Sequence, residues 1–222
     1  MTWLPLCLVI FDCDGVLIDS EPVSRRVLME EAAALGFRLT EAGAHAFTGQ
    51  TWYAIKPVFE ARIGRSLPDL WPQMLCDRVI ARMALTIEPI AGAREALEAT
   101  TVLGLAYRIA SNSSHEEMAI KFSGTAMSDL VAGRIFSARD VRRGKPAPDI
   151  FLAASGGIDP RACIVVEDST PGITGAQAAG MRVIAYAPDG LPAGLARAPD
   201  AIVTSLAELP AVFAAAMHPQ AS

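Results

Sequence analysis

The chain has 222 residues, 52% of them apolar, and a formal net charge of −5. This length suits one domain or a domain with an insertion, and the apolar fraction is too high for a disordered chain. The acidic balance disfavours a nucleic-acid surface. Four scattered cysteines without a CxxC pair indicate reduced thiols rather than a disulfide framework or a zinc site. No uncharged apolar stretch approaches about 18 residues, so we expect a soluble, cytoplasmic protein that does not enter membranes.

The first part of the chain combines one strand with a long helical stretch. Leu6–Phe11 is an apolar run that ends directly in acid, which is typical of a buried parallel strand. Glu21–Leu35 has helical periodicity, and Gly36 ends it. From there to about Pro89 the apolar pattern stays helical and contains no run that indicates a buried strand.

After Pro89 the pattern alternates between helix and strand. We predict helices over residues 93–100, 116–126, 149–155 and 173–179, and strands over 106–110, 134–136, 163–166, 182–185 and 201–204. Such alternation indicates a parallel sheet with helices on both faces, joined by right-handed crossovers. The predicted plan is an α/β core of residues 1–16 and 89–222, with a helical insertion of residues 17–88 after the first strand.

Conspicuous polar residues follow the predicted strands, where ligands bind in sheets of this kind. They are Asp12 and Asp14, Ser111 and Asn112, Glu167 and Asp168, with Lys145 in a loop between two strands. Four clustered carboxylates repel one another unless a cation neutralises them, and hard oxygen ligands favour Mg²⁺. Lys145 and the Ser111 hydroxyl then suit phosphate oxygens, because phosphoryl transfer depends on positioning and charge neutralisation.

The positions of the two aspartates after the first strand predict a different role for each. Asp12 directly ends the strand, so we assign it nucleophilic attack on phosphorus. Asp14 lies just beyond, before Gly15 lets the chain turn, and we assign it proton transfer to the leaving alcohol and from water. Each pattern alone has an ordinary alternative, since the serine and Glu167–Ser169 segments could be helix caps and Lys145 a solvated loop residue. The four patterns in this order favour a catalytic site.

Four segments resemble the haloacid dehalogenase-like superfamily, in its phosphatase and β-phosphoglucomutase branch. They are VIFDCDGVLIDSE at Val9–Glu21, IASNS at Ile109–Ser113, GKPAPDIF at Gly144–Phe151 and VVEDSTPGI at Val165–Ile173. The resemblance implies a Rossmann-like, doubly wound parallel sheet with an inserted α-helical cap. It also implies an aspartyl-phosphate on Asp12, and Mg²⁺ held by Asp12, the backbone carbonyl of Asp14, and Asp168, with Glu167 nearby or acting through water. Ser111, Asn112 and Lys145 would bind the phosphate.

The insertion resembles the helical cap of this branch. The segment FTGQT at Phe47–Thr51 is similar to the family's substrate-facing loop, so Gly49, Gln50, Thr51 and Trp52 are candidate specificity residues. Trp52 and Tyr53 could form an apolar wall against the substrate or pack within the cap.

Departures from the family patterns reduce the number of activities that the resemblance implies for this chain. Asp14 argues against the dehalogenases, which lack a second aspartate. Ser24 and Trp52 stand where the β-phosphoglucomutases carry a histidine and an arginine. We therefore expect a phosphatase of a sugar, sugar-alcohol or organic-acid phosphate, acting as a monomer or weak homodimer. The alternatives are a sugar phosphomutase and a catalytically silent binding or regulatory module on the same fold.

Overall fold

The computed structural model describes residues 3–47 and 50–218. The chain forms two compact units, which we call the core unit and the helical unit. The core unit comprises the chain up to Asp19 and from Pro89 onward, and the helical unit is Ser20–Glu88. The predicted insertion of residues 17–88 begins slightly before the helical unit does. That this insertion acts as a cap domain stays a prediction.

The described part of the core unit contains a six-stranded sheet with the order β5-β4-β1-β6-β7-β8. Every neighbouring pair in this sheet is parallel. The strands are β1 Leu8–Phe11, β4 Ala106–Ser111, β5 Ile135–Ser137, β6 Cys163–Glu167, β7 Arg182–Tyr186 and β8 Ala201–Val203. The strands β1, β6 and β7 are buried along their whole length, as expected for a parallel sheet covered on both faces.

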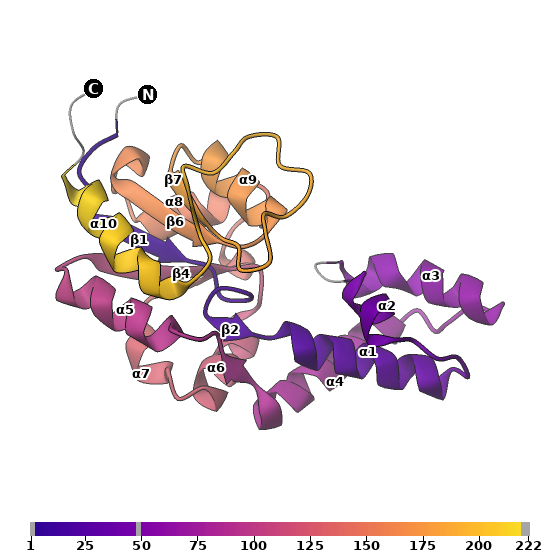
Figure 1. The fold of residues 1–222 in the computed structure, drawn as a ribbon. Helices are drawn as coiled ribbons and strands as arrows, with labels where there is room; N and C mark the ends of the chain where they lie inside the picture. Colours follow the sequence, from indigo (N-terminus) through magenta and orange to yellow (C-terminus); the bar gives the residue numbers. More distant parts are fainter. Residues whose placement is uncertain (1–2, 48–49, 219–222) are drawn as a thin grey trace. The chain divides into compact units, whose positions relative to one another are not determined.

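Helices cover both faces of this sheet (Figure 1). They are α5 Ala93–Val102, α6 His115–Gly124, α7 Ser128–Val131, α8 Asp149–Ser155, α9 Thr170–Ala178 and α10 Leu209–Met217. On one face, Phe11 packs edge-to-face against Tyr107 and against Phe213 of α10. On the other, Ile10 belongs to a buried cluster with Phe151 of α8. The predicted Rossmann-like α/β fold is confirmed.

Local capping explains where the helix bounds differ from the predicted ones. The helix predicted over residues 116–126 begins at His115, because Ser114 and Glu117 form a capping box. It ends at Gly124, and Ala126 has a left-handed backbone with φ 53°. The helix predicted from residue 173 begins earlier because Ser169 caps it by accepting the backbone N–H of Gly172. The helix α10 was not predicted.

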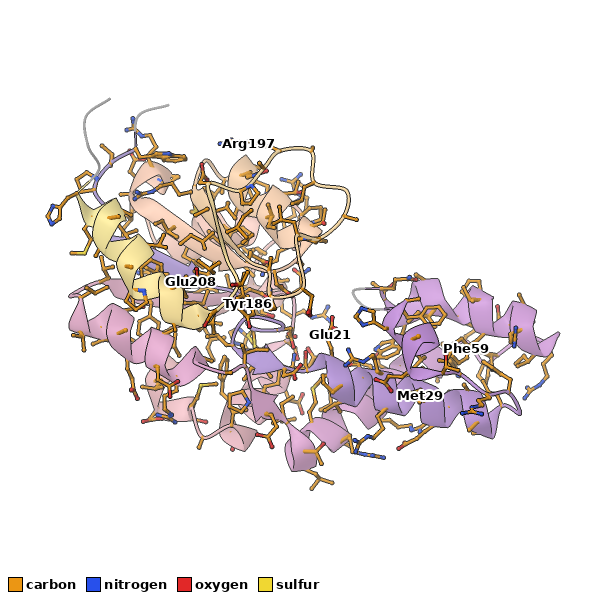
Figure 2. The ribbon with its side chains drawn as sticks, in the orientation of Figure 1. Glu21, Met29, Phe59, Tyr186, Arg197 and Glu208 are labelled. Atoms are coloured by element: carbon orange, nitrogen blue, oxygen red, sulfur yellow. The ribbon has the colours of Figure 1, made fainter. Side chains whose placement is uncertain are left out.

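The helical unit contains α1 Glu21–Ala34, α2 Glu41–His45, α3 Trp52–Ile63 and α4 Trp71–Thr86. Its core forms around Phe59, which Figure 2 shows among the side chains of these helices. The Phe59 ring contacts the rings of Phe37, Phe47 and Trp71. Two short strands, β2 Ile18–Asp19 and β3 Glu88–Pro89, pair where the chain passes between the units. Among the described helices, none has the length and apolar character needed to cross a membrane.

Candidate active site

The predicted site residues of the core unit lie at the carboxyl ends of three adjacent strands. Asp12 follows β1, Ser111 ends β4 and Glu167 ends β6. Because β1 lies between β4 and β6 in parallel register, these three positions share one edge of the sheet. The sheet topology thus brings together residues that lie far apart in the sequence, at the edge where open α/β sheets bind ligands.

Lys145 lies between two of the predicted carboxylates. Its ammonium group donates to the carboxylate of Asp12 and, at 2.6 Å, to Oε1 of Glu167. The Lys145 side chain is only 4% exposed. Burial alone would lower the pKa of Lys145, but the charges of Asp12 and Glu167 outweigh it, so its pKa is raised. Lys145 is therefore a fixed positive charge beside Asp12, not a solvated loop residue.

The loop that carries Lys145 is held by Asn112. The side-chain oxygen of Asn112 accepts the backbone N–H of Lys145 at 2.9 Å, and its amide nitrogen donates to the Lys145 carbonyl at 3.4 Å. Asn112 thus positions the lysine, and its predicted contact with phosphate stays a prediction. The Ser111 hydroxyl is buried and accepts the backbone N–H of Ser113 at 3.1 Å.

Glu167 is fully buried, and the protein itself satisfies both of its oxygens. Oε1 accepts from Lys145, while Oε2 accepts the backbone N–H groups of Asp168 and Ser169 and the Ser169 hydroxyl. A Cβ atom at Gly172 would lie 1.8 Å from Oε1 of Glu167, so the first turn of α9 can approach this carboxylate only with glycine there. These contacts make Glu167 an anchor for Lys145.

Asp12, Glu167 and Asp168 each offer a carboxylate oxygen, and these atoms lie within 4.8 Å of one another. Burial and repulsion from Glu167 raise the pKa of Asp12 to about 7 and that of Asp168 to about 9, against the opposing charge of Lys145. A Cβ at Gly15, whose φ is 81°, would lie 2.0 Å from Oδ2 of Asp168. The crowded, charge-rich oxygen set fits a small hard divalent cation such as Mg²⁺.

Asp14 has different neighbours. Its carboxylate oxygens lie 2.7 and 2.8 Å from the ammonium nitrogen of Lys121, on α6. The Ser113 hydroxyl donates to Oδ2 of Asp14 at 3.0 Å, and Lys121 also donates to this hydroxyl at 2.8 Å. Burial would lower the pKa of Lys121, but the Asp14 carboxylate outweighs it and raises the pKa. The structure thus separates the two aspartates into two environments.

The sequence analysis missed Lys121 and Ser113 as neighbours of Asp14. One signal was available, since Met118, Lys121 and Phe122 have the spacing of one helical face and the first and last are apolar. All three are buried in the structure. A buried lysine on an otherwise apolar face of a helix needs a partner of opposite charge, and Asp14 is that partner.

The predicted specificity residues belong to the helical unit. Gly49 lies outside the described residues. The Gln50 side chain donates to the carbonyl of Ala46 at 3.0 Å, and Thr51 caps α3 by accepting the backbone N–H of Ala54. Trp52 is the first residue of α3. Their contact with substrate stays a prediction.

Three comparisons relate the chain to known proteins. Residues 8–180 match the hydrolase family described as haloacid dehalogenase-like hydrolase. Hexitol phosphatase B of Escherichia coli is 34% identical over 185 residues, covering 79% of this chain and 81% of that protein. The chloroplastic protein SUPPRESSOR OF QUENCHING 1 of Arabidopsis thaliana is 30% identical over 189 residues, covering 82% of this chain but only 18% of that longer protein.

Solved structures agree with this relationship. A HAD family hydrolase from Deinococcus radiodurans, solved with bound phosphate and sodium, is 32% identical, with a TM-score of 0.82 and coverage of 96% of each chain. A haloacid dehalogenase-like protein from Agrobacterium tumefaciens is also 32% identical, with a TM-score of 0.81 and coverage of 95% of this chain and 98% of that one. With its family match, its fold and its phosphatase relatives, the chain belongs to the haloacid dehalogenase-like hydrolases, in the branch that includes hexitol phosphatase B.

Proposed function

We propose that this hydrolase is a Mg²⁺-dependent phosphatase that transfers the phosphoryl group of a small metabolite to Asp12 and then to water. The observation that carries this proposal is the separation of Asp12 and Asp14. Asp12 lies in a cluster with Lys145, Glu167 and Asp168, whereas Asp14 is bound by Lys121 and Ser113. Two carboxylates with different surroundings suit two different chemical roles.

The proposed first step forms an aspartyl-phosphate. A carboxylate oxygen of Asp12 attacks phosphorus, and the bond between phosphorus and the oxygen of the substrate alcohol breaks. The electron pair of that bond stays on the leaving oxygen, which takes a proton from the carboxyl group of Asp14. Lys145, buried beside Asp12, stabilises the negative charge of the phosphoryl group during transfer.

The proposed second step releases phosphate. A water molecule gives a proton to the Asp14 carboxylate and attacks phosphorus. The bond between phosphorus and the Asp12 oxygen breaks, and inorganic phosphate leaves. Asp12 is ionised again and Asp14 is protonated again, so the two residues are ready for another substrate.

The metal would be held by Asp12, Asp168 and the backbone carbonyl of Asp14. Glu167 would remain behind them, because its oxygens already bind Lys145 and the start of α9. Mg²⁺, when bound, neutralises the negative charge of the phosphate and of the clustered carboxylates. The HAD family relative with bound phosphate and sodium supports an anion and a cation together on this fold.

For the substrate, we propose a sugar, sugar-alcohol or sugar-acid phosphate. This rests on relatives whose names state hexitol phosphatase and 6-phosphogluconate phosphatase activities, the latter 27% identical over 211 residues. The helical unit would supply the residues that distinguish one substrate from another, and Gln50, Thr51 and Trp52 are the described candidates. Core residues that act on the phosphate would serve every substrate.

The test is a panel of phosphorylated metabolites that includes hexitol phosphates, phosphogluconate and fructose phosphate. The purified protein with Mg²⁺ should release inorganic phosphate from at least one of them and lose this activity in excess chelator. An isomeric sugar phosphate as the product, instead of free phosphate, would identify a mutase. Absence of turnover across the whole panel and with p-nitrophenyl phosphate would reject the phosphatase proposal.

A further inference from the structure

We propose that Lys121 is a positioning residue that fixes the carboxylate of Asp14 for proton transfer. The inference rests on the proposed phosphatase function and adds a residue outside the motifs that identify the family. Lys121 lies on α6, 107 positions from Asp14 in the sequence. Both residues belong to the core unit, so one compact body holds them.

The contacts restrain the carboxylate in two ways. The Lys121 ammonium lies 2.7 and 2.8 Å from the two oxygens of Asp14, so one cation spans the whole group. The Ser113 hydroxyl binds Oδ2 at 3.0 Å and is itself bound by Lys121 at 2.8 Å. The three groups form a closed triangle. Rotation of the carboxylate would break charge-assisted hydrogen bonds to Lys121, whose side chain is only 5% exposed.

The triangle also ties Asp14 to the predicted phosphate-binding hydroxyl. The backbone N–H of Ser113 donates to the Ser111 hydroxyl at 3.1 Å, while the Ser113 side chain donates to Asp14. Ser113 therefore sets the separation between the proton-transfer group and a group that would contact the phosphate. A proton donor must lie within hydrogen-bond reach of the leaving oxygen, so this separation matters for the reaction.

The composition of the chain supports a specific use of lysine at this position. Arginine supplies 16 of the 19 basic side chains, and only Lys56, Lys121 and Lys145 are lysines. Lys121 and Lys145 are both buried, and each binds one of the two aspartates after β1. An ammonium group is compact and can bind both oxygens of a carboxylate from one point, whereas the larger planar guanidinium needs more room.

The first experiment compares substrates with good and poor leaving groups. Lys121→Met removes the ammonium but keeps an unbranched apolar side chain in its place. Without the triangle, we expect kcat/KM, which reports formation of the aspartyl-phosphate, to fall about 10²-fold for a sugar phosphate and at least about 10-fold less for p-nitrophenyl phosphate. The nitrophenolate leaves without a proton, so in the first step only the sugar phosphate needs a well-placed Asp14, whereas hydrolysis of the aspartyl-phosphate needs Asp14 for both substrates.

A matched control separates positioning from simple loosening of α6. Phe122→Leu reduces packing at the next residue of the same helix, where the side chain is buried but is not part of the triangle. It should lower both rates by the same factor. Lys121→Arg retains the charge and should recover part of the sugar-phosphate rate. If Lys121 had only a structural role, its substitution would affect both substrates equally, whatever their leaving groups.

A double-mutant cycle decides whether Lys121 acts through Asp14. In an Asp14→Asn background, Lys121→Met should change the sugar-phosphate rate by less than about 3-fold, because there is no carboxylate left to position. Equal losses for both substrates in Lys121→Met, or a full additional loss in the double variant, would overturn the inference while leaving the phosphatase proposal intact. Absence of turnover by the wild-type protein would instead overturn the phosphatase proposal, and the positioning role with it.

Discussion

Lys145 and Lys121 are both buried and both bind an aspartate that follows β1, yet their surroundings differ in charge. Lys145 contacts Asp12 and Glu167, and Asp168 lies within the same acidic group. Three carboxylates therefore share one lysine. Lys121 contacts one carboxylate, that of Asp14, and the neutral hydroxyl of Ser113. The first cluster has excess negative charge, and the second is balanced.

This difference separates two tasks that a phosphatase must combine. Burial, together with the excess negative charge around Asp12, raises the pKa values of Asp12 and Asp168, and the excess charge suits a divalent cation that would also neutralise the phosphoryl group. The balanced pair around Asp14 needs no further cation and fixes its carboxylate. Phosphoryl transfer therefore fits the first cluster, and proton transfer fits the second.

The largest effect should come from removing the carboxylate of Asp12. Asp12→Asn deletes the nucleophile, and kcat should fall by roughly 10⁴-fold or more for every substrate. Asp14→Asn should lower kcat/KM less with p-nitrophenyl phosphate than with a sugar phosphate, for which general acid catalysis of the first step contributes about 10²–10⁴-fold. Phosphate release and circular dichroism on both variants measure rate and folding. Equal losses in the two variants across all leaving groups would remove the distinction between the clusters.

The next effect concerns stability. Lys145→Met leaves Asp12 and Glu167 buried without their shared cation, and it should lower the free energy of unfolding by about 3 kcal/mol, typical of a broken buried ion pair. Lys121→Met should cost less, because the Asp14 side chain is 32% exposed and can be hydrated. Urea unfolding in chelator measures both. A larger loss for Lys121→Met would mean that the Asp14 pair, and not the Asp12 cluster, dominates the stability of this edge.

The pH dependence of stability should reveal the uncompensated charge of the Asp12 cluster. The folded-state pKa values of Asp12 and Asp168, about 7 and about 9, lie above their ordinary value of 3.8. Between pH 3.8 and these raised pKa values, the folded protein thus binds more protons than the unfolded chain. Its stability is therefore highest at low pH and falls as the pH rises through about 7 and then about 9.

Unfolding midpoints of metal-free protein should therefore fall from about pH 4 to about pH 9, most steeply below about pH 7, where both carboxyl groups contribute. Mg²⁺ binds the ionised carboxylates, so it should raise the midpoints most at the alkaline end. Asp168→Asn is the control, because it removes the higher of the two titrations and should flatten the decline above about pH 8. A midpoint that does not depend on pH in chelator would contradict the raised pKa values.

The smallest effect on the chemistry itself should come from the helical unit, outside both clusters. Trp52→Ala should change the ratio of rates for two sugar phosphates by about 10-fold and leave p-nitrophenyl phosphate hydrolysis nearly unchanged. Trp52→Phe, which keeps an aromatic ring at the same position, is the matched control and should change this ratio less. A uniform loss across the panel for Trp52→Ala would assign Trp52 to packing of the unit.

The sequence predicts structure best where a signal is local. The helix predicted over residues 149–155 has the observed bounds of α8, because Pro148 lies at its start and Gly156 ends it in a left-handed conformation. By contrast, α10 was missed because its alanine-rich sequence carries little amphipathic pattern. The packing that holds this helix, such as the contact of Phe213 with Phe11, exists only in the folded protein.

The same contrast applies to the site. Lys145 was predicted from a short motif although it lies 133 positions from Asp12 in the sequence. Lys121 has no such motif, and its contact with Asp14 arises only in the folded chain, where α6, the helix after β4, brings it beside the residues that follow β1. For Asn112, the family resemblance implied phosphate binding, which stays a prediction, and the structure adds that its side chain holds the Lys145 loop.

The burial of two of the three lysines has a practical consequence for labelling and immobilisation. Reagents that acylate lysine side chains need an accessible, unprotonated amine, and the raised pKa values of Lys121 and Lys145 keep both charged as well as hidden. Lys56, with 18% of its side chain exposed, is the more accessible lysine. Amine coupling should therefore attach dyes or a solid support at Lys56, in the helical unit, and leave the two buried lysines that bind the aspartates unmodified.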